Sequence, residues 1–155
     1  MKKIPLIFVL LIICGCSSTS SNIINKIEMN NNNCKIVKQV DNHGGFLGDG
    51  EYFARIKCSN IKEEELSKHW KKLPLSNSIN EATNINHCDS KGCYNIYEKY
   101  NIPNIKNGYY YFLDRNSESK NKYDDTYLND RHSHNYTLAL LDKNTDIIYY
   151  YELDT

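Results

Sequence analysis

Apolar and polar residues alternate in two segments of the N-terminal half, CKIVKQV (Cys34–Val40) and YFARIKC (Tyr52–Cys58). A period of two is typical of a half-buried strand, so each segment is predicted to be a strand. An antiparallel hairpin centred on Phe46 gathers nearly every apolar side chain of both segments on one face. The predicted pairs are Cys34 with Cys58, Ile36 with Ile56, Lys38 with Ala54 and Val40 with Tyr52.

The C-terminal third is predicted to contain three further strands, the first of which is rich in aromatic residues. These predicted strands are Tyr109–Leu113, Tyr136–Leu141 and Ile147–Leu153, and a turn at 143–146 joins the last two. Opposing Asp142 with Ile147 produces one apolar face along that hairpin. Its predicted pairs are Tyr136 with Leu153, Leu138 with Tyr151 and Leu140 with Tyr149.

Between the two groups of strands the pattern predicts helix. Asn60 and Glu63 have the spacing of a capping box, Pro74 can end the helix, and an apolar stripe runs between them through Leu66, Trp70 and Leu73. A shorter helix is predicted around Tyr94–Tyr100. The fold class is therefore α+β, a mainly antiparallel sheet of about five strands with one main helix on one face.

The N-terminus begins with two lysines and an apolar run, Ile4–Ile13. This run is too short for a transmembrane helix, which needs ~20 residues, but it suits a signal peptide. The following tetrad Ile13-Cys14-Gly15-Cys16 resembles the lipobox of bacterial lipoproteins, although isoleucine and Cys14 depart from the usual leucine and serine or alanine. The resemblance implies that residues 1–15 are removed and that Cys16 is diacylated. The alternatives are an uncleaved membrane anchor and a plain secretory signal.

A diacylated Cys16 would hold the protein on the extracytoplasmic face of a membrane, because two acyl chains give stable anchoring. Residues 16–33 are polar and of low complexity, and they are predicted to form a flexible tether. Residues 34–155 then form a single domain. Loss of Lys2 and Lys3 changes 19 basic against 19 acidic residues to 17 against 19. Such a charge balance excludes the basic surface expected of a nucleic-acid-binding protein.

Four cysteines remain in the domain: Cys34, Cys58, Cys88 and Cys93. An even number in a small exported domain favours disulfides over a metal site. The hairpin register pairs Cys34 with Cys58, and the short spacing of CDSKGC then pairs Cys88 with Cys93.

The loop between the first two strands, DNHGGFLGDGE, is rich in glycine and acidic residues. It has no lysine for phosphate and no alternating oxygen ligands for calcium, so it predicts no cofactor. One interpretation is a structured turn in which Phe46 or Leu47 folds back onto the domain. The other is a ligand loop that uses His43 and Asp49.

The loop and the C-terminal YYYELDT together resemble segments of small proteins from low-GC bacteria. Those proteins carry HGGFxGDGE and a YYEFDT-like strand, and they have no assigned function. This resemblance implies that both segments belong to one domain.

The polar segment 115–135 contains a further pair of histidines. His132 and His134 would project from the same side of an extended segment, the spacing at which two imidazoles can share zinc. A third ligand must come from elsewhere, and His43 is the obvious donor. The alternative is a solvated loop with no ligand. If a site exists, we expect His43 and Asp49 to face its ligand together with His132 or His134.

The favoured function is a non-enzymatic binding or accessory role for a membrane-anchored lipoprotein, with a protein, peptide or envelope component as ligand. No serine lies in a Gly-x-Ser-x-Gly motif, and the cysteines are assigned to disulfides or lipid. The alternative is a small metal-dependent or histidine-based hydrolase that acts on the cell envelope. The 13 tyrosines are interpreted as core and cross-strand packing rather than as a binding platform.

Overall fold

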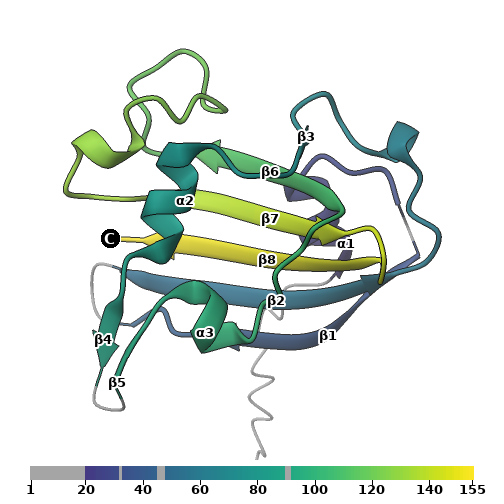
Figure 1. Ribbon diagram of the computed structural model, residues 1–155, viewed down its shortest axis with the longest axis horizontal. Helices are drawn as coiled ribbons and strands as arrows, with labels where there is room; N and C mark the ends of the chain where they lie inside the picture. The colour runs from purple at the N-terminus through teal and green to yellow at the C-terminus, as the bar shows by residue number, and fades with distance from the viewer. Residues whose placement is uncertain (1–19, 32, 45–47, 90–91) are drawn as a thin grey trace, which may run out of the picture.

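Antiparallel strands form the centre of the molecule in a computed structural model that describes residues 20–31, 33–44, 48–89 and 92–155. Within these ranges six strands make one sheet in the order β1-β2-β8-β7-β6-β3 (Figure 1). The strands are β1 (Cys34–Asp41), β2 (Gly50–Cys58), β3 (Lys71–Lys72), β6 (Gly108–Asp114), β7 (Tyr136–Asp142) and β8 (Ile147–Asp154). A separate hairpin pairs β4 (His87–Asp89) with β5 (Gly92–Tyr94).

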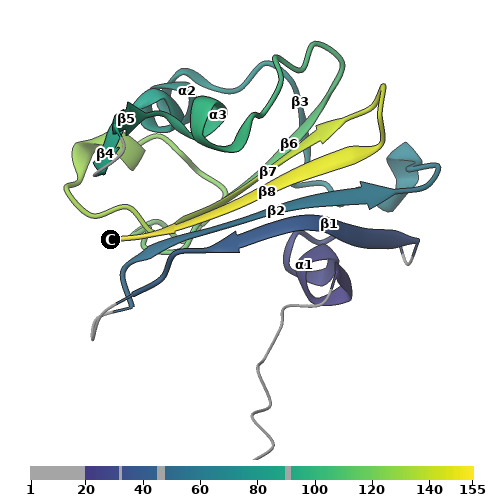
Figure 2. The same ribbon diagram turned by 90° about the horizontal axis from the view of Figure 1, so that it is seen from below.

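Helices lie on both faces of the sheet rather than on one. Figure 2 shows α1 (Ser20–Lys26) on one face and both α2 (Asn77–Asn84) and α3 (Ile96–Tyr100) on the other. Two short 3₁₀ helices, η1 (Glu63–Glu65) and η2 (Leu128–Asp130), lie in the connections. The α+β class is confirmed, whereas the expected single main helix and five-strand sheet are not. In the described ranges no helix has the length and apolar character needed to span a bilayer.

Each of the five predicted strands corresponds to a strand of the sheet. The register predicted for the last hairpin is confirmed, since Tyr136 lies opposite Leu153 and Leu140 opposite Tyr149. The first hairpin starts in the predicted register and then shifts by one residue after Ile36. The remaining predicted pairs are therefore wrong: Lys38 lies opposite Arg55, and Val40 opposite Phe53.

A β-bulge accounts for that shift. The irregularity lies between Ile36 and Lys38, where Val37 is the extra residue and its side chain is half exposed, at 50%. A bulge places two residues opposite one, so every pair beyond it moves by one position. The bulge also interrupts the outer edge of β1, a device by which natural sheets avoid pairing with other chains.

Both predicted disulfides are present. Cys34–Cys58 joins the paired ends of β1 and β2 with Cα atoms 4.1 Å apart, and Cys88–Cys93 joins β4 to β5 with Cα atoms 4.0 Å apart. Each bridge therefore links two strands that already pair directly.

The helix predicted over residues 60–73 is wrong. Asn60 has a left-handed backbone with φ 54°, which does not start a helix, and the segment contains only η1 before Lys71–Lys72 pairs with β6. Its apolar residues are spaced for a helix but have separate long-range partners. Leu66 forms a bridge with Met29, and the Trp70 indole donates to the carbonyl of Ile27 at 2.8 Å.

The flexible tether predicted for residues 16–33 is also wrong for the described residues from 20 onward. Ser20–Lys26 is helical, and the segment through Met29 places four apolar side chains in the core. These side chains, all with 4% exposure or less, are Ile23, Ile24, Ile27 and Met29. The surrounding composition is polar, but these four positions bury enough surface to order the helix against the sheet.

The two faces of the sheet carry separate cores. Residues of one parity along β2, β8 and β7, among them Ile56, Tyr150 and Leu141, pack with α1 and Trp70. Residues of the other parity, among them Phe53 and Tyr151, pack with α2 and α3. The tyrosines of β6 and β8 are thus mainly core residues, in agreement with their interpretation as core and cross-strand packing. The sheet holds the two helical layers apart, and the α2–α3 layer forms the groove described below.

Candidate functional site

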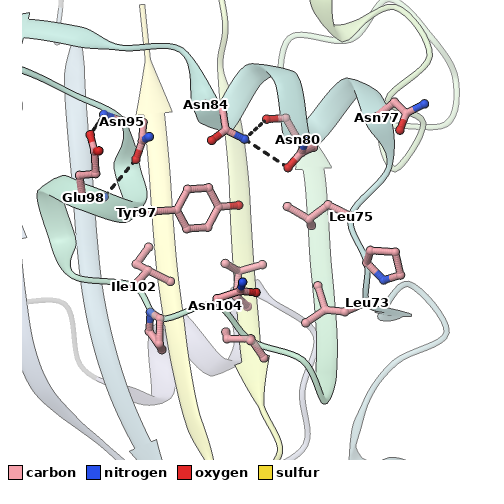
Figure 3. Close-up of a pocket in the computed structure, with 14 residues that line it drawn as sticks. Leu73, Leu75, Asn77, Asn80, Asn84, Asn95, Tyr97, Glu98, Ile102 and Asn104 are labelled. Atoms are coloured by element: carbon pink, nitrogen blue, oxygen red, sulfur yellow. Dashed lines mark hydrogen bonds between the residues drawn. The ribbon is translucent and has the colours of Figure 1, made fainter.

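A groove of about 620 Å³ opens between α2, α3 and the sheet (Figure 3). This volume is within the range of ~300–1,000 Å³ that is common for small-molecule sites. Its floor and lower wall are apolar, and its upper wall is rich in asparagine. The described lining residues are Leu73, Pro74, Leu75, Asn77, Asn80, Asn84, Asn95, Tyr97, Glu98, Ile102, Pro103, Asn104, Ile105 and Leu140.

The upper wall is α2, which begins at a Ser76 cap whose side chain accepts from the Ile79 amide at 3.3 Å. Ile79 and Ala82 are buried against the sheet. Because positions three and four residues apart share one helix face, the asparagines at 77, 80 and 84 form a second, polar stripe. Asparagine is a poor helix former, so the stripe does not help the helix to form.

The opposite wall is α3, which is fixed to the sheet from both sides. Tyr100 stacks on Phe53 with ring centroids 4.2 Å apart, and Lys99 pairs with the carboxylate of Glu51 on β2. Asn95 caps the helix by accepting from the Glu98 amide at 3.0 Å. With α3 held in this way, Tyr97 projects from it across the groove toward α2 (Figure 3).

The lining carries little charge. Among the described lining residues Glu98 has the one carboxylate, and that carboxylate accepts a capping bond from the Asn95 amide. Lysine, arginine and histidine are absent from the described lining residues. Several amides and one tyrosine thus face an apolar floor that includes Leu140, so the groove is suited to an uncharged ligand that combines apolar and hydrogen-bonding surfaces.

His43 lies at the end of the sheet where β8 finishes. Its Nδ1 contacts the Asp41 carboxylate at 2.7 Å and its Nε2 contacts the Asp154 carboxylate at 3.1 Å. The loop that follows His43 leads back into β2 at Gly50 and requires glycine there. At this position φ is +152°, and an added Cβ would lie 2.6 Å from the His43 Cα atom. The glycine there has a local structural reason, as the turn interpretation of the loop requires.

The other predicted site residues gather near the same end without forming one site. The backbone carbonyl of Asp49 accepts from the Gly44 amide at 3.2 Å. The His134 amide donates to the Thr155 hydroxyl at 2.8 Å, beside Asp154, while the His132 side chain is exposed. His43 and His134 thus lie on either side of the C-terminal residues and contact different groups.

Zinc ligation by these histidines gains no support from their contacts. Across the described ranges no three His, Cys, Asp or Glu side chains are grouped as metal ligands. The predicted signal peptide 1–15, the predicted lipidation site Cys16 and the loop residues Phe46 and Leu47 lie outside the described residues.

The contacts of His43 predict a pH dependence of stability. Its hydrogen bond with Asp41 raises the pKa of His43, partial burial opposes this, and Asp154 adds to the increase. A raised folded-state pKa means that the stabilisation is complete below the unfolded pKa of ~6.5 and is lost as the pH rises through the folded value. Relative to a His43→Gln variant, wild type should lose up to ~1 kcal/mol of unfolding free energy between acidic and mildly alkaline pH, since the pair is solvent-accessible.

Urea unfolding of both proteins at a series of pH values measures this difference. His132→Gln is the matched control, because it removes an exposed histidine from the same end of the molecule. A His43→Gln difference that is constant with pH would contradict the assignment of the ion pairs.

A polar cluster on the α1 face was not predicted. Glu28 accepts from the Tyr123 hydroxyl and pairs with His69 Nδ1 at 2.7 Å, while the His69 and Tyr123 rings stack 3.5 Å apart. Burial acts to raise the pKa of Glu28, but the hydrogen bonds from Tyr123 and His69 outweigh it and the pKa is lowered. The cluster joins the residues after α1 to the segment between β6 and β7, which is a structural role.

The groove residues were also missed by the sequence analysis. A signal for α2 exists in the sequence: Ser76 follows Pro74, and Ile79, Ala82 and Thr83 have the spacing of a short amphipathic helix. The sequence analysis assigns no helix or strand between Pro74 and Tyr94, so α2 (Asn77–Asn84) was overlooked. The joint exposure of the three asparagines becomes visible only when α2 is recognised.

Comparison with known proteins identifies no relative of this chain, so the groove is interpreted from its own geometry. No family model, curated protein or solved structure matches the chain.

Proposed function

We propose that this chain is a lipid-anchored extracytoplasmic binding protein and that the groove between α2 and α3 is its ligand site. The observation that carries the proposal is the groove, a formed concavity with an apolar floor and converging neutral polar groups. The two disulfides support export, because such bonds persist in oxidising compartments. The lipobox-like tetrad that ends at Cys16 supports the anchor.

The position of α1 supports an orientation in which the groove points away from the membrane. Ser20 begins α1 on the face of the sheet opposite to α2 and α3 (Figure 2). Cys16 precedes Ser20 by four residues, a length of chain that reaches at most ~14 Å when fully extended. A lipid on Cys16 therefore keeps the α1 face close to the bilayer and leaves the groove open to the exterior.

The anchor can be tested by replacing Cys16. We expect Cys16→Ala to abolish incorporation of a fatty-acid analogue and to move the protein from the membrane fraction to the soluble extracytoplasmic fraction, because two acyl chains supply the stable anchoring. Cys14→Ala is the matched control and should remain labelled and membrane-bound. Unchanged labelling and membrane retention of Cys16→Ala would rule out this lipid anchor.

The ligand site can be tested with the Cys16→Ala protein, in which lipid anchoring does not add to retention. Asn84→Trp places a large ring at the upper wall of the groove, whereas Asn22→Trp makes the same change at an exposed position of α1 on the opposite face. Retention on washed cell-envelope fractions should fall at least tenfold with Asn84→Trp and stay unchanged with Asn22→Trp. Equal retention of both variants, each verified as folded by circular dichroism, would reject the groove as the binding site.

A further inference from the structure

We propose that the groove binds a neutral saccharide, with the Tyr97 ring as the surface on which one sugar ring stacks and with Asn80, Asn84 and Asn104 as partners of its hydroxyl groups. The assignment rests on the proposed function, because it names the class of ligand for the same groove.

The Tyr97 ring is held in place before any ligand arrives. It projects from α3 between the asparagines of α2 and the chain at Asn104, and its face is turned toward the open side of the groove (Figure 3). Its hydroxyl lies 3.3 Å from the hydroxyl of the buried Thr83, and burial raises the pKa of Tyr97. The hydroxyl is therefore engaged within the protein, and the face of the ring is the part left for a ligand. Aromatic faces carry negative charge density that attracts the C–H side of a sugar ring.

The amides on the two walls match the chemistry of hydroxyl groups. A sugar hydroxyl both donates and accepts, and an asparagine side chain can do the same through one carbonyl oxygen and one NH₂ group. Asn84 donates to the Asn80 carbonyl at 2.7 Å through its NH₂ group, which leaves its side-chain oxygen as an acceptor. Asn104 is exposed on the other side of Tyr97 (Figure 3). The ring thus lies between two sets of donors and acceptors.

The charge of the lining and the topology of the sheet favour a saccharide over an anionic ligand or an extended peptide. The described lining residues offer no basic group for a phosphate or carboxylate, and the one carboxylate among them is used in capping α3. One common way for an extended peptide to gain affinity is to add a strand to a free sheet edge. The floor residue Leu140 belongs to β7, which is an interior strand paired with both β6 and β8. Among the described lining residues Leu140 is the only one that lies in a strand, so these residues offer a peptide no strand edge to extend.

The test is titration of the full-length protein in detergent with the β-1,4-linked tetramers of glucose and of N-acetylglucosamine, followed by calorimetry and NMR. At least one tetramer should bind with a Kd in the micromolar to millimolar range typical of small, exposed sites. Binding should weaken at least tenfold with Tyr97→Ala and with Asn104→Ala. It should persist in Tyr97→Phe, which keeps the ring, and in Tyr127→Ala, which removes an exposed tyrosine (68%) outside the groove.

Asn104→Ala protects the test against misfolding, because this side chain is exposed and its removal should leave the unfolding free energy unchanged. Failure of both tetramers to bind at ~10 mM, or binding that survives both Tyr97→Ala and Asn104→Ala, would overturn the saccharide assignment. A neutral hexapeptide that binds in their place and is lost in the same variants would also overturn it, while leaving the proposed function intact. Envelope retention that is insensitive to Asn84→Trp would instead overturn the proposed function itself.

Discussion

Replacing Ile27 with alanine should lower the free energy of unfolding by about 2–5 kcal/mol, the usual cost of removing a large buried aliphatic side chain. Ile27 has 0% exposure and lies just after α1, where its carbonyl also accepts the Trp70 indole hydrogen bond at 2.8 Å. Truncation leaves a cavity between α1 and the sheet that the ordered strands cannot fill. Equilibrium unfolding in urea, followed by tryptophan fluorescence, measures both the stability and the environment of the contacting Trp70.

Asn25→Ala provides the matched control for this substitution. Asn25 is an exposed residue of α1, and alanine has the higher helix propensity, so its replacement should change stability by less than ~0.7 kcal/mol. The comparison also decides between two views of the N-terminal segment. A flexible tether predicts no effect from either substitution, whereas a docked helix predicts a loss from Ile27→Ala alone. Equal stability of the two variants would remove α1 from the folded domain.

The strands could be predicted because their information is local. In β7 and β8 the apolar residues form nearly continuous runs, as in strands that are buried on both faces, and opposing Asp142 with Ile147 fixes every later pair. The register of the first hairpin also depends on the bulge at Val37. Neither the length nor the composition of the hairpin indicates that bulge. A bulge depends on how β1 fits the twist of β2, so a pattern with strict period two misses it.

The two helix errors share one physical cause. Residues 60–73 and 20–29 contain apolar side chains whose partners are each other, and the Met29–Leu66 bridge and the Trp70–Ile27 hydrogen bond join the two segments. Taken alone, residues 60–73 have a spacing that imitates a helix, and residues 20–29 have a composition too polar to predict a folded segment. Long-range contacts outweigh local propensity in both, as is common where propensity is a weak term.

The candidate site was hidden for a related reason. Its walls come from segments around 77–84, 95–98 and 102–105, and β7 supplies part of its floor. Each segment alone shows ordinary surface residues, since asparagine is frequent throughout the chain. The histidines and glycines drew attention because they are chemically versatile residue types. In the structure, Gly50 serves the turn, and His43 holds the end of β8 through Asp154.

Removal of the Cys34–Cys58 bridge by a double alanine substitution should destabilise the protein by about 3 kcal/mol, and removal of Cys88–Cys93 by about 2 kcal/mol or less. The difference follows from loop length, because the first bridge closes a sequence separation of 24 residues and the second only 5. A longer loop loses more conformational freedom in the unfolded chain when it is closed.

The positions of the two disulfides in the fold also predict a larger loss of stability for Cys34–Cys58 than for Cys88–Cys93. Cys58 is buried at 1% exposure and holds β1, an edge strand paired only with β2 among the described strands, whereas Cys88 and Cys93 are exposed in a two-stranded hairpin. Denaturant unfolding of the two double variants beside wild type under non-reducing conditions measures both losses. If the Cys88/Cys93 variant lost as much stability as the Cys34/Cys58 variant, loop length would not govern these bridges. The β4–β5 hairpin would then have to contribute to the packing of α2 and α3, and with it to the shape of the groove.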